Sequence, residues 1–346
     1  MRKIAVNTRS LSAPLTGVQR YTRELLARWN GHADRVAPTT PLHGIKGHAW
    51  EQTVLPRRLA RELLFSPANS GPLEVGNQVV TIHDMAYFDH PETLTRTYAA
   101  WYRFMLPRLV TKVRKIITVS GFVKERIIAR TGVAADKIVV IPNGVGSRFR
   151  PEAIAERAKA LAELGLGMER YILALGSIEP RKNLARLLAA WEHVHRSMPS
   201  DLWLVVAGGA GSPAIFKTEK TNPLPPRVCL TGHVDDDLLP GLVAGAVGLA
   251  YPTFYEGFGL PALEAMASGV PTLVGDCDAL REVAGNAAIF VDPYRPETIA
   301  EGLLRIAQDD ALRLRLRNEG MIRARQFSWD LAANTTWNLL QRVAEG

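Results

Sequence analysis

The chain has 346 residues, 47% hydrophobic and 22% charged, which is enough for two domains that each bury a core. Prolines and glycines interrupt its longest uncharged run, 238–255, and this argues against a membrane-spanning helix. Two isolated cysteines, Cys229 and Cys277, argue against a disulfide framework or a zinc site.

The positive excess lies in the first part of the chain: residues 1–145 carry 21 Lys and Arg against 10 Asp and Glu, and the remainder carries 21 against 24, which gives the net charge of +8. Such a surface attracts nucleic acid, an anionic membrane or an acidic substrate. Ordinary solvated charge is the alternative interpretation. The first residues hold too few apolar side chains for a signal peptide, so we expect a cytoplasmic protein.

The first elements are a strand over 3–7, a loop around Gly17 and a helix through Tyr21 and Trp29. Residues 36–78 mix prolines, glycines and short apolar pieces, and we predict variable structure there. Arg57 and Arg58 form a basic patch in this part.

A buried strand over 78–83 ends in His83 and Asp84, and Tyr87 follows shortly after. The carboxyl ends of parallel strands line the crevice where open α/β sheets bind ligands, so His83 is a candidate functional residue. A lone histidine is more often a hydrogen-bonded structural residue, and that alternative stays open on the residues alone.

Residues 97–115 interleave aromatic and apolar side chains with arginines and lysines. This pattern fits a helix at a membrane interface or an ordinary amphipathic helix, and we expect Pro107 to interrupt it. A strand over 116–120, a helix capped by Ser120 and a strand over 138–141 follow. The turn-rich run 142–146 coincides with the change in charge balance, so we place the domain boundary there.

A second series of strands and helices begins with a strand over 171–175. Gly176 follows it, and Arg181 and Lys182 precede a helix over 184–195; two adjacent cations suit a diphosphate. Strands over 202–207 and 228–231 end near Gly208 and Val234, at the same edge. Residues 235–237 are three aspartates that we expect to cap a helix, so we assign no metal site.

Residues 248–276 form one unit, predicted as a strand up to Phe254, a turn over 256–259 and a helix over 260–268. A glycine turn that leads into a helix presents N–H groups and a partial positive charge to an anion. Glu256 on the turn and Glu264 inside the helix would repel that anion unless they faced hydroxyls. The sequence therefore predicts a nucleotide-sugar ligand.

The segment Tyr-Glu-Gly-Phe-Gly-Leu-Pro-x-Leu-Glu-Ala-Met-Ala-x-Gly-x-Pro, with Glu256 and Glu264 in a Glu-x7-Glu spacing, resembles the signature of the retaining family 4 glycosyltransferases. The resemblance spans essentially the whole chain. It implies an α/β protein of GT-B fold, with two facing Rossmann-like domains, parallel sheets and an interdomain cleft. We expect an acceptor-binding domain over 1–145, a nucleotide-sugar-binding domain over 146–327, and a helix over about 328–346, capped by Ser328, that packs back on the first domain.

The implied reaction moves a hexosyl unit from a nucleoside-diphosphate sugar to a hydroxyl, with retention at the anomeric carbon and no obligatory metal or cofactor. The leaving phosphate is expected to accept the acceptor's proton. The implied catalytic residues are Glu256, His83, Arg181 and Lys182. The implied donor-binding residues are Gly17, Gly176, Arg181, Lys182, Gly208, Val234, Glu256, Gly257, Phe258, Gly259, Leu260 and Glu264. The implied acceptor-binding residues are Asp84, Tyr87, Arg57 and Arg58.

Two segments, 16–25 and 176–184, look most like mannosyltransferases of bacterial surface polysaccharide and O-antigen assembly, so we expect GDP-mannose as donor. The basic first domain suits a glycan or polyprenyl-linked acceptor, and an anionic membrane surface at the inner face of the cell membrane; nucleic acid is not the expected partner. Three alternatives remain: a GT-B sugar-nucleotide 2-epimerase, a non-enzymatic nucleic-acid-binding protein, and an inactive sugar-nucleotide sensor.

Overall fold

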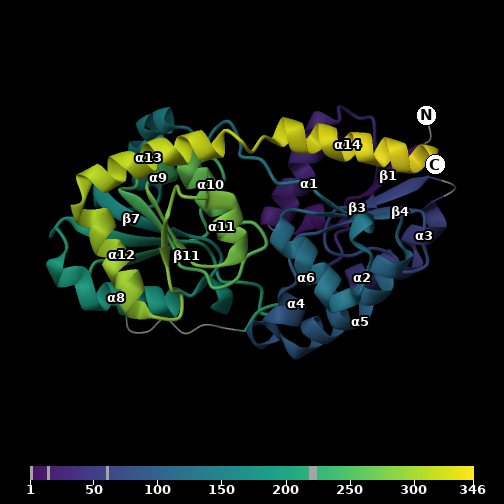
Figure 1. Cartoon of the computed structure of the whole chain (residues 1–346), viewed down its shortest axis with the longest axis horizontal. Helices are drawn as coiled ribbons and strands as arrows, with labels where there is room; N and C mark the ends of the chain where they lie inside the picture. Colours follow the sequence, from purple (N-terminus) through teal and green to yellow (C-terminus); the bar gives the residue numbers. More distant parts are fainter. Residues whose placement is uncertain (1–2, 14–15, 60–61, 218–223) are drawn as a thin grey trace. The chain divides into compact units, whose positions relative to one another are not determined.

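The computed structural model describes residues 3–13, 16–59, 62–217 and 224–346. The chain forms two compact units (Figure 1). The first contains Met1–Pro91, Arg96–Gly144 and Ser328–Gly346, and the second contains Glu92–Thr95 and Val145–Phe327. Each unit is built on a six-stranded sheet whose neighbouring strands are all parallel.

The sheet of the first unit has the strand order β2-β1-β3-β4-β5-β6. Strands β1, β3 and β4 are buried along their whole length, as expected for a parallel sheet covered by helices on both faces. The strands are β1 (Ile4–Asn7), β2 (Asp34–Val36), β3 (Leu63–Ser66), β4 (Gln78–Ile82), β5 (Lys115–Thr118) and β6 (Ile138–Val140).

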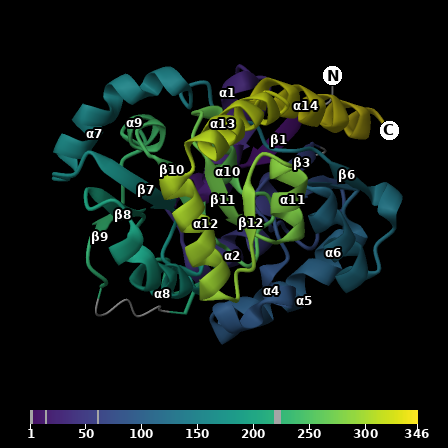
Figure 2. The same ribbon diagram turned by 60° about the vertical axis from the view of Figure 1, so that its left-hand side comes forward.

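The C-terminal helix α14 (Trp329–Glu345) belongs to the first unit and lies beside α1 (Gly17–Arg28), as Figures 1 and 2 show. The Trp29 indole N–H donates to the Ala333 carbonyl at 3.1 Å. Ser328 caps α14 by accepting from two backbone N–H groups, which confirms the predicted cap. The other helices of this unit are α2 (Gly44–Thr53), α3 (Leu55–Arg58), α4 (Ala86–Asp89), α5 (Arg96–Lys112) and α6 (Gly121–Thr131), with short 3-10 turns η1 (Arg9–Ser12) and η3 (Ala135–Lys137); η2 (Pro91–Thr93) runs into the second unit.

One expectation for the first unit is wrong. Helix α5 runs without a break through Pro107. Proline lacks the N–H that the helix needs, but buried side chains on both sides of it, such as Leu106 and Leu109, pack the helix into the core of the first unit. Residues 36–78, for which we predicted variable structure, contain α2, α3 and the interior strand β3. The predicted cap at Ser120 is confirmed, because its side chain accepts from the Val123 N–H at 3.2 Å.

The sheet of the second unit has the order β12-β11-β10-β7-β8-β9. Its strands are β7 (Arg170–Leu175), β8 (Leu202–Ala207), β9 (Val228–Gly232), β10 (Gly248–Tyr251), β11 (Thr272–Gly275) and β12 (Ile289–Val291). The segment Glu92–Thr95 joins this unit through the stretch after β8, where the Thr95 N–H donates to the Ile215 carbonyl at 2.8 Å.

Successive strand residues alternate between two apolar clusters, one on each face of the second sheet. Leu204 packs with Trp191 and Leu303 in the cluster beneath α8 (Leu184–Val194) and α12 (Pro296–Gln308), two helices that lie side by side (Figure 1). The neighbouring residue Val205 packs on the other face, with Leu242. The other helices are α7 (Arg157–Glu163), α9 (Leu239–Ala244), α10 (Leu260–Ala267), α11 (Asp278–Ala284) and α13 (Asp310–Ala324), with η4 (Pro151–Glu156), η5 (Pro180–Lys182) and η6 (His195–Ser197).

No helix in the described ranges is both long and apolar enough to cross a membrane.

Candidate active site

The strand order of the second sheet reverses at β7, which lies between β8 and β10. Strands β7, β8 and β10 end at Leu175, Ala207 and Tyr251, at the same edge because they are parallel. Open α/β sheets bind ligands at such a switch point. The loops that follow these three strands are therefore the candidate site of the second unit.

Glu256 is at the centre of a buried polar cluster at this edge, which we name the Glu256 cluster: Arg181, Lys182, Tyr251, Thr253 and Glu256. Its carboxylate accepts from the Lys182 ammonium at 2.5 Å, from the Tyr251 hydroxyl at 2.7 Å and from the Thr253 hydroxyl at 3.3 Å. The Arg181 guanidinium lies 3.8 Å from its second oxygen. Only 7% of Glu256 is exposed, so these contacts replace most of its hydration.

Two electrostatic effects compete at Glu256. Burial raises the pKa of its carboxyl group, but Lys182, Arg181 and the Tyr251 hydroxyl together outweigh burial and hold the pKa below its ordinary value. Burial and the neighbouring Glu256 raise the pKa of Tyr251 well above its ordinary value. At neutral pH the cluster therefore contains an ionised carboxylate and a protonated phenol.

Hydrogen bonds around η5 fix the backbone that carries the two cations, Arg181 and Lys182. Both lie on η5, which the left-handed residue Asn183 ends at φ 65°. The Asn183 side chain donates to the carbonyls of Pro252 and Pro293, and the Arg181 carbonyl accepts from the Thr253 hydroxyl at 2.7 Å. The loop after β7 is thus tied to the loop after β10.

The glycine turn has the geometry that the sequence predicts. Gly259 has φ 100°, and a Cβ there would lie 2.4 Å from a Leu280 methyl carbon, so only glycine fits. Helix α10 begins at the next residue, Leu260, and Glu264 within it is 4% exposed. Gly257 is buried in the turn, and the Phe258 ring packs edge-on against Phe327.

Gly176 and Gly208 bring the loops after β7 and β8 together. Gly208 has φ 153°, and a Cβ there would lie 1.9 Å from the Gly176 carbonyl oxygen. Gly176 has φ 145° and lies against the Lys182 side chain. Val234 is buried in the apolar cluster with Leu238. A cavity of about 30 Å³, enough for one water molecule, lies here between Gly176, Lys182 and Tyr251.

Sequence reasoning missed Glu179, which has no exposed surface. Its carboxylate lies 2.6 Å from the Arg181 Nε, but neither oxygen forms a hydrogen bond of good geometry within the described part of the chain. Arg181 therefore lies between two carboxylates, Glu179 and Glu256, and its guanidinium also lies over the Phe216 ring at 5.8 Å. The only sequence signal for Glu179 is its place two residues before Arg181.

Residues 235–237 do not cap a helix, contrary to our expectation. They lie in a turn ahead of α9, whose N-cap is Leu238, and Asp236 forms an ion pair with Arg148. Leu238 occupies the N-cap position, so none of the three aspartates is the capping residue. Among the described residues, no group of three His, Cys, Asp or Glu side chains is arranged to hold a metal ion.

In the first unit, His83 directly follows β4 and is 8% exposed. Its Nε2 lies 2.7 Å from the Pro67 carbonyl, which only accepts, so Nε2 carries the proton and Nδ1 is the acceptor. Burial lowers the pKa of His83 despite the Pro67 carbonyl and Asp84, so the ring is neutral at pH 7. The Tyr21 ring packs edge-on against it at 4.8 Å.

The other predicted residues of the first unit are placed as follows. Asp84 accepts from the Ala86 N–H at the start of α4, and the Tyr87 hydroxyl donates to the Asp84 carbonyl at 2.7 Å, with the Tyr87 ring buried. Arg57 and Arg58 are exposed on α3 and donate to backbone carbonyls of Thr53 and Ala37. Gly17 is the first residue of α1.

Sequence reasoning also missed a buried carboxylate in the first unit. Glu51 of α2 has no exposed surface and accepts from Asn7 at 2.7 Å and from Ser70 at 3.0 Å, with Arg9 at 3.4 Å. Burial raises the pKa of Glu51, but Arg9, His48 and Ser70 bring it below its ordinary value. The carboxylate ties α2 to the carboxyl ends of β1 and β3.

Known proteins resemble this chain in sequence and in fold. A family model described as "Glycosyl transferases group 1" matches residues 156–323, and one described as "Glycosyltransferase Family 4" matches residues 74–147. The O-antigen chain mannosyltransferase B of Escherichia coli is 32% identical over 269 residues, which cover 77% of this chain and 71% of that protein. The chain belongs to the family 4 glycosyltransferases.

This glycosyltransferase is also 30% identical to the O-antigen chain mannosyltransferase RfbU of Salmonella typhimurium, over 72% of the chain and 65% of the length of that protein. Its fold matches the Anabaena protein Alr3699/HepE, solved in complex with UDP-glucose, with a TM-score of 0.76 at 16% identity over 99% of this chain and 100% of that one. The GT-B class predicted from the sequence is confirmed by this likeness and by the two parallel sheets.

Proposed function

We propose that this glycosyltransferase transfers a mannosyl unit from GDP-mannose to a hydroxyl of a glycan or lipid-linked glycan, in the assembly of bacterial O-antigen or a related polysaccharide. The two relatives above, named O-antigen chain mannosyltransferases, support the sugar and the pathway class. The Glu256 cluster is the observation that supports glycosyl transfer, because it places two cations and a carboxylate at the switch point of the second sheet.

The proposed donor site follows from the charges of the second unit. Arg181, Lys182 and the N–H groups of residues 257–259 bind the diphosphate, and the Glu256 carboxylate binds hydroxyls of the sugar and favours positive charge at the anomeric carbon. Glu264 binds the ribose. The nucleotide is lined by the backbone of Gly176, Gly208 and Val234 and by Leu260, the first residue of α10.

The transfer proceeds with retention. The bond between the anomeric carbon and the diphosphate oxygen breaks, the acceptor oxygen bonds to that carbon, and the acceptor's proton passes to the departing phosphate. Protein cations rather than a divalent metal stabilise the leaving group, so we propose a metal-independent reaction.

The first unit is proposed to bind the acceptor. His83 is a neutral ring whose Nδ1 accepts a hydrogen bond from the donor sugar or the acceptor. Asp84, Tyr87, Arg57 and Arg58 are the proposed acceptor-side residues, and Gly17 is proposed to face the leaving phosphate. The cleft expected between the domains stays a prediction. We propose that the enzyme works in the cytoplasm, at the inner face of the membrane that carries a polyprenyl-linked acceptor.

A ligand screen tests the donor. Thermal shift and calorimetry with GDP, UDP, ADP and dTDP and their sugars, with and without magnesium, should give a selective, metal-independent stabilisation by GDP and GDP-mannose. Lys182→Ala should abolish that shift, whereas Lys159→Ala, which removes an exposed lysine of the same unit, should keep it.

Product analysis tests the reaction. With an acceptor, GDP release and an axial mannosyl linkage, read by NMR, are expected. Conversion of the nucleotide-sugar without acceptor would identify a 2-epimerase instead. Selective binding of another diphosphate would replace GDP-mannose, and no shift with any nucleotide would overturn the donor site.

A further inference from the structure

We propose that Tyr251 is a positioning residue, whose buried hydroxyl holds the Lys182 ammonium and the Glu256 carboxylate in the arrangement that receives the donor. This inference rests on the proposed function for its consequence, but its geometry belongs to the unliganded protein. No spacing or motif in the sequence indicated Tyr251.

The three polar groups form a closed triangle. The Tyr251 hydroxyl accepts from Lys182 at 2.6 Å and donates to Glu256 at 2.7 Å, and the ammonium donates to the same carboxylate oxygen at 2.5 Å. A hydroxyl has one donor and two acceptor positions, so it serves both partners at once. A phenylalanine of nearly the same shape would serve neither.

The hydroxyl has little freedom to move. Tyr251 is the last residue of β10 and is 3% exposed, with its ring in the apolar cluster beneath the sheet. The Lys182 ammonium lies 4.9 Å from the centre of that ring. Because the ring is fixed by packing, the position of its oxygen sets where the two charged groups meet.

In the proposed reaction, Lys182 and Glu256 exchange each other for groups of the donor. When the donor binds, the ammonium takes a phosphate oxygen and the carboxylate takes sugar hydroxyls. The Tyr251 hydroxyl stays hydrogen bonded to each group during that exchange. Without it, Lys182 would keep Glu256 as its hydrogen-bond partner in the cluster, and Glu256 would keep Lys182, the Thr253 hydroxyl and the more distant Arg181. The pairing of ammonium and carboxylate would then compete with the donor.

Tyr251→Phe tests this inference, with Tyr171→Phe as matched control. Tyr171 is another fully buried tyrosine of the same unit, and its hydroxyl donates to the Leu242 carbonyl at 2.7 Å, outside the Glu256 cluster. Both changes remove one buried phenolic hydroxyl, so a loss of stability alone would affect both variants alike.

The first measurement needs no donor. A carbon-13 NMR titration should follow the Glu256 carboxyl group in the wild type and both variants. The groups that face Glu256 are Lys182 and Arg181 from η5, the Tyr251 hydroxyl from β10 and Cys277, whose thiol stays neutral because burial raises its pKa to about 12. Only Tyr251→Phe removes one of these groups, so only that variant should titrate at higher pH than the wild type.

The second measurement is steady-state kinetics with the donor found in the screen. A hydrogen bond to a charged group predicts a loss of about 10- to 100-fold in kcat/KM for Tyr251→Phe. The acid limb of its pH profile should also move to higher pH. Tyr171→Phe should keep the kinetic constants and the profile of the wild type.

The outcomes separate the two proposals. If Tyr251→Phe matches Tyr171→Phe in both measurements, the positioning role is overturned, while wild-type turnover still supports the proposed function. If the wild type turns over no nucleotide-sugar, the proposed function fails. The NMR titration alone then decides whether the Tyr251 hydroxyl organises Lys182 and Glu256. A Glu256 titration that is unchanged in Tyr251→Phe would overturn the positioning role as well.

Discussion

At the scale of single residues, the buried side chain of Glu179 leads to a prediction about Arg181. Its carboxylate has no exposed surface and no well-formed hydrogen bond among the described residues, and its near partner is the Arg181 Nε. Taking a carboxylate out of water is expensive, and removing one partner of a buried ion pair is costly chiefly when it leaves the other charge uncompensated. Arg181 would keep Glu256 as a carboxylate neighbour if Glu179 were replaced by a neutral group. We expect Glu179 to orient Arg181 rather than to stabilise the fold.

Glu179→Gln should therefore leave the unfolding temperature unchanged or raise it, and should lower turnover because Arg181 loses the partner on its Nε side. The measurements are thermal unfolding and steady-state kinetics with the donor identified by the screen. Glu163→Gln, the same change at an exposed position of α7, should affect neither. A drop in unfolding temperature with normal kinetics would instead assign Glu179 a structural role.

The buried ring of His83 leads to a prediction about how the stability of the fold depends on pH. Burial holds its folded-state pKa below the ordinary value of 6.5, so the unfolded chain binds the proton more readily. The stability that the neutral ring contributes is fully present above pH 6.5 and is lost as the pH falls from there through the folded-state pKa. His83→Gln keeps a side-chain N–H for the Pro67 carbonyl but does not titrate.

The difference in unfolding free energy between the wild type and His83→Gln should change in favour of the variant as the pH falls below 6.5. Chemical denaturation at several pH values measures it. A difference that stays constant with pH would mean that the histidine is not held neutral. The same variant lacks Nδ1 as an acceptor and should turn over more slowly at neutral pH.

At the scale of the elements, the site depends on how closely the loops after β7 and β8 approach each other. Gly208 permits that approach, because any Cβ there would collide with the Gly176 carbonyl. The neighbouring Gly209 is different: a Cβ there would meet only His233, at 3.7 Å, which is ordinary contact.

Gly208→Ala should lower the free energy of unfolding by about 1–3 kcal/mol, as overpacking does, and should weaken binding of the nucleotide. Gly209→Ala should be nearly neutral in both. Chemical denaturation and calorimetry with the preferred diphosphate test the pair. Equal behaviour of the two variants would show that the close approach of the loops is not needed.

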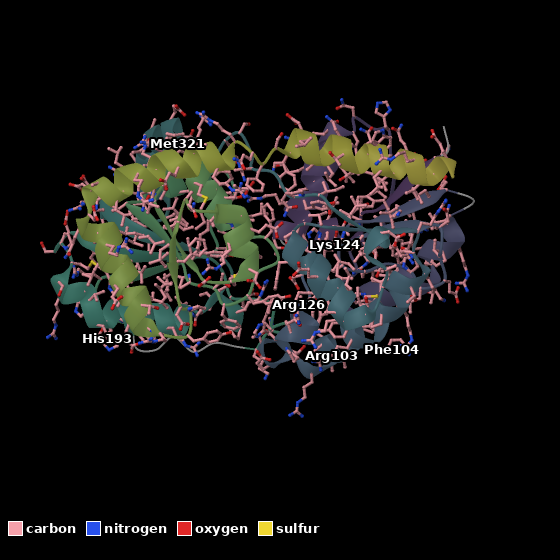
Figure 3. The ribbon with its side chains drawn as sticks, in the orientation of Figure 1. Arg103, Phe104, Lys124, Arg126, His193 and Met321 are labelled. Atoms are coloured by element: carbon pink, nitrogen blue, oxygen red, sulfur yellow. The ribbon has the colours of Figure 1, made fainter. Side chains whose placement is uncertain are left out.

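At the scale of the whole molecule, the net charge is +8, and all of the positive excess lies in residues 1–145. In the first unit, Arg103 and Phe104 lie on α5, and Lys124 and Arg126 lie on α6 (Figure 3). Phe104 is 49% exposed, and the Arg108 guanidinium lies 3.9 Å from its ring centre. An exposed aromatic ring with a cation beside it suits an anionic membrane surface, which is the proposed location of the acceptor.

The wild type should therefore sediment with vesicles that contain anionic lipid, and salt should weaken the binding. Phe104→Ser with Arg108→Glu should reduce binding strongly. Leu314→Ser with Arg315→Glu, a similar pair of changes at exposed positions of α13, should keep it. Equal binding by the two double variants would remove α5 from the membrane proposal, and no binding by the wild type would remove the membrane itself.

The sequence by itself determined the classes of structure that depend on neighbouring residues. Apolar runs predicted strands in both sheets, though not β2, β3 or β12, and a glycine turn predicted the start of α10. A serine ahead of an apolar period predicted the caps at Ser120 and Ser328. Prediction from the sequence failed where tertiary packing outweighs local preference. Helix α5 continues through Pro107, and β3 lies in a stretch without a clear hydrophobic period.

Only the tertiary structure decided which side chains meet. Lys182 and Glu256 are 74 residues apart and Asn7 and Glu51 are 44 apart, yet each pair forms a hydrogen bond. Hydrophobic periodicity reports which face of an element is buried, but it carries no information on the partner across the sheet. For that reason Glu256 and Lys182 were candidates from the sequence. Tyr251 contacts both of them and Glu179 contacts Arg181, but these two residues became visible only when parallel strands brought their carboxyl ends to one edge.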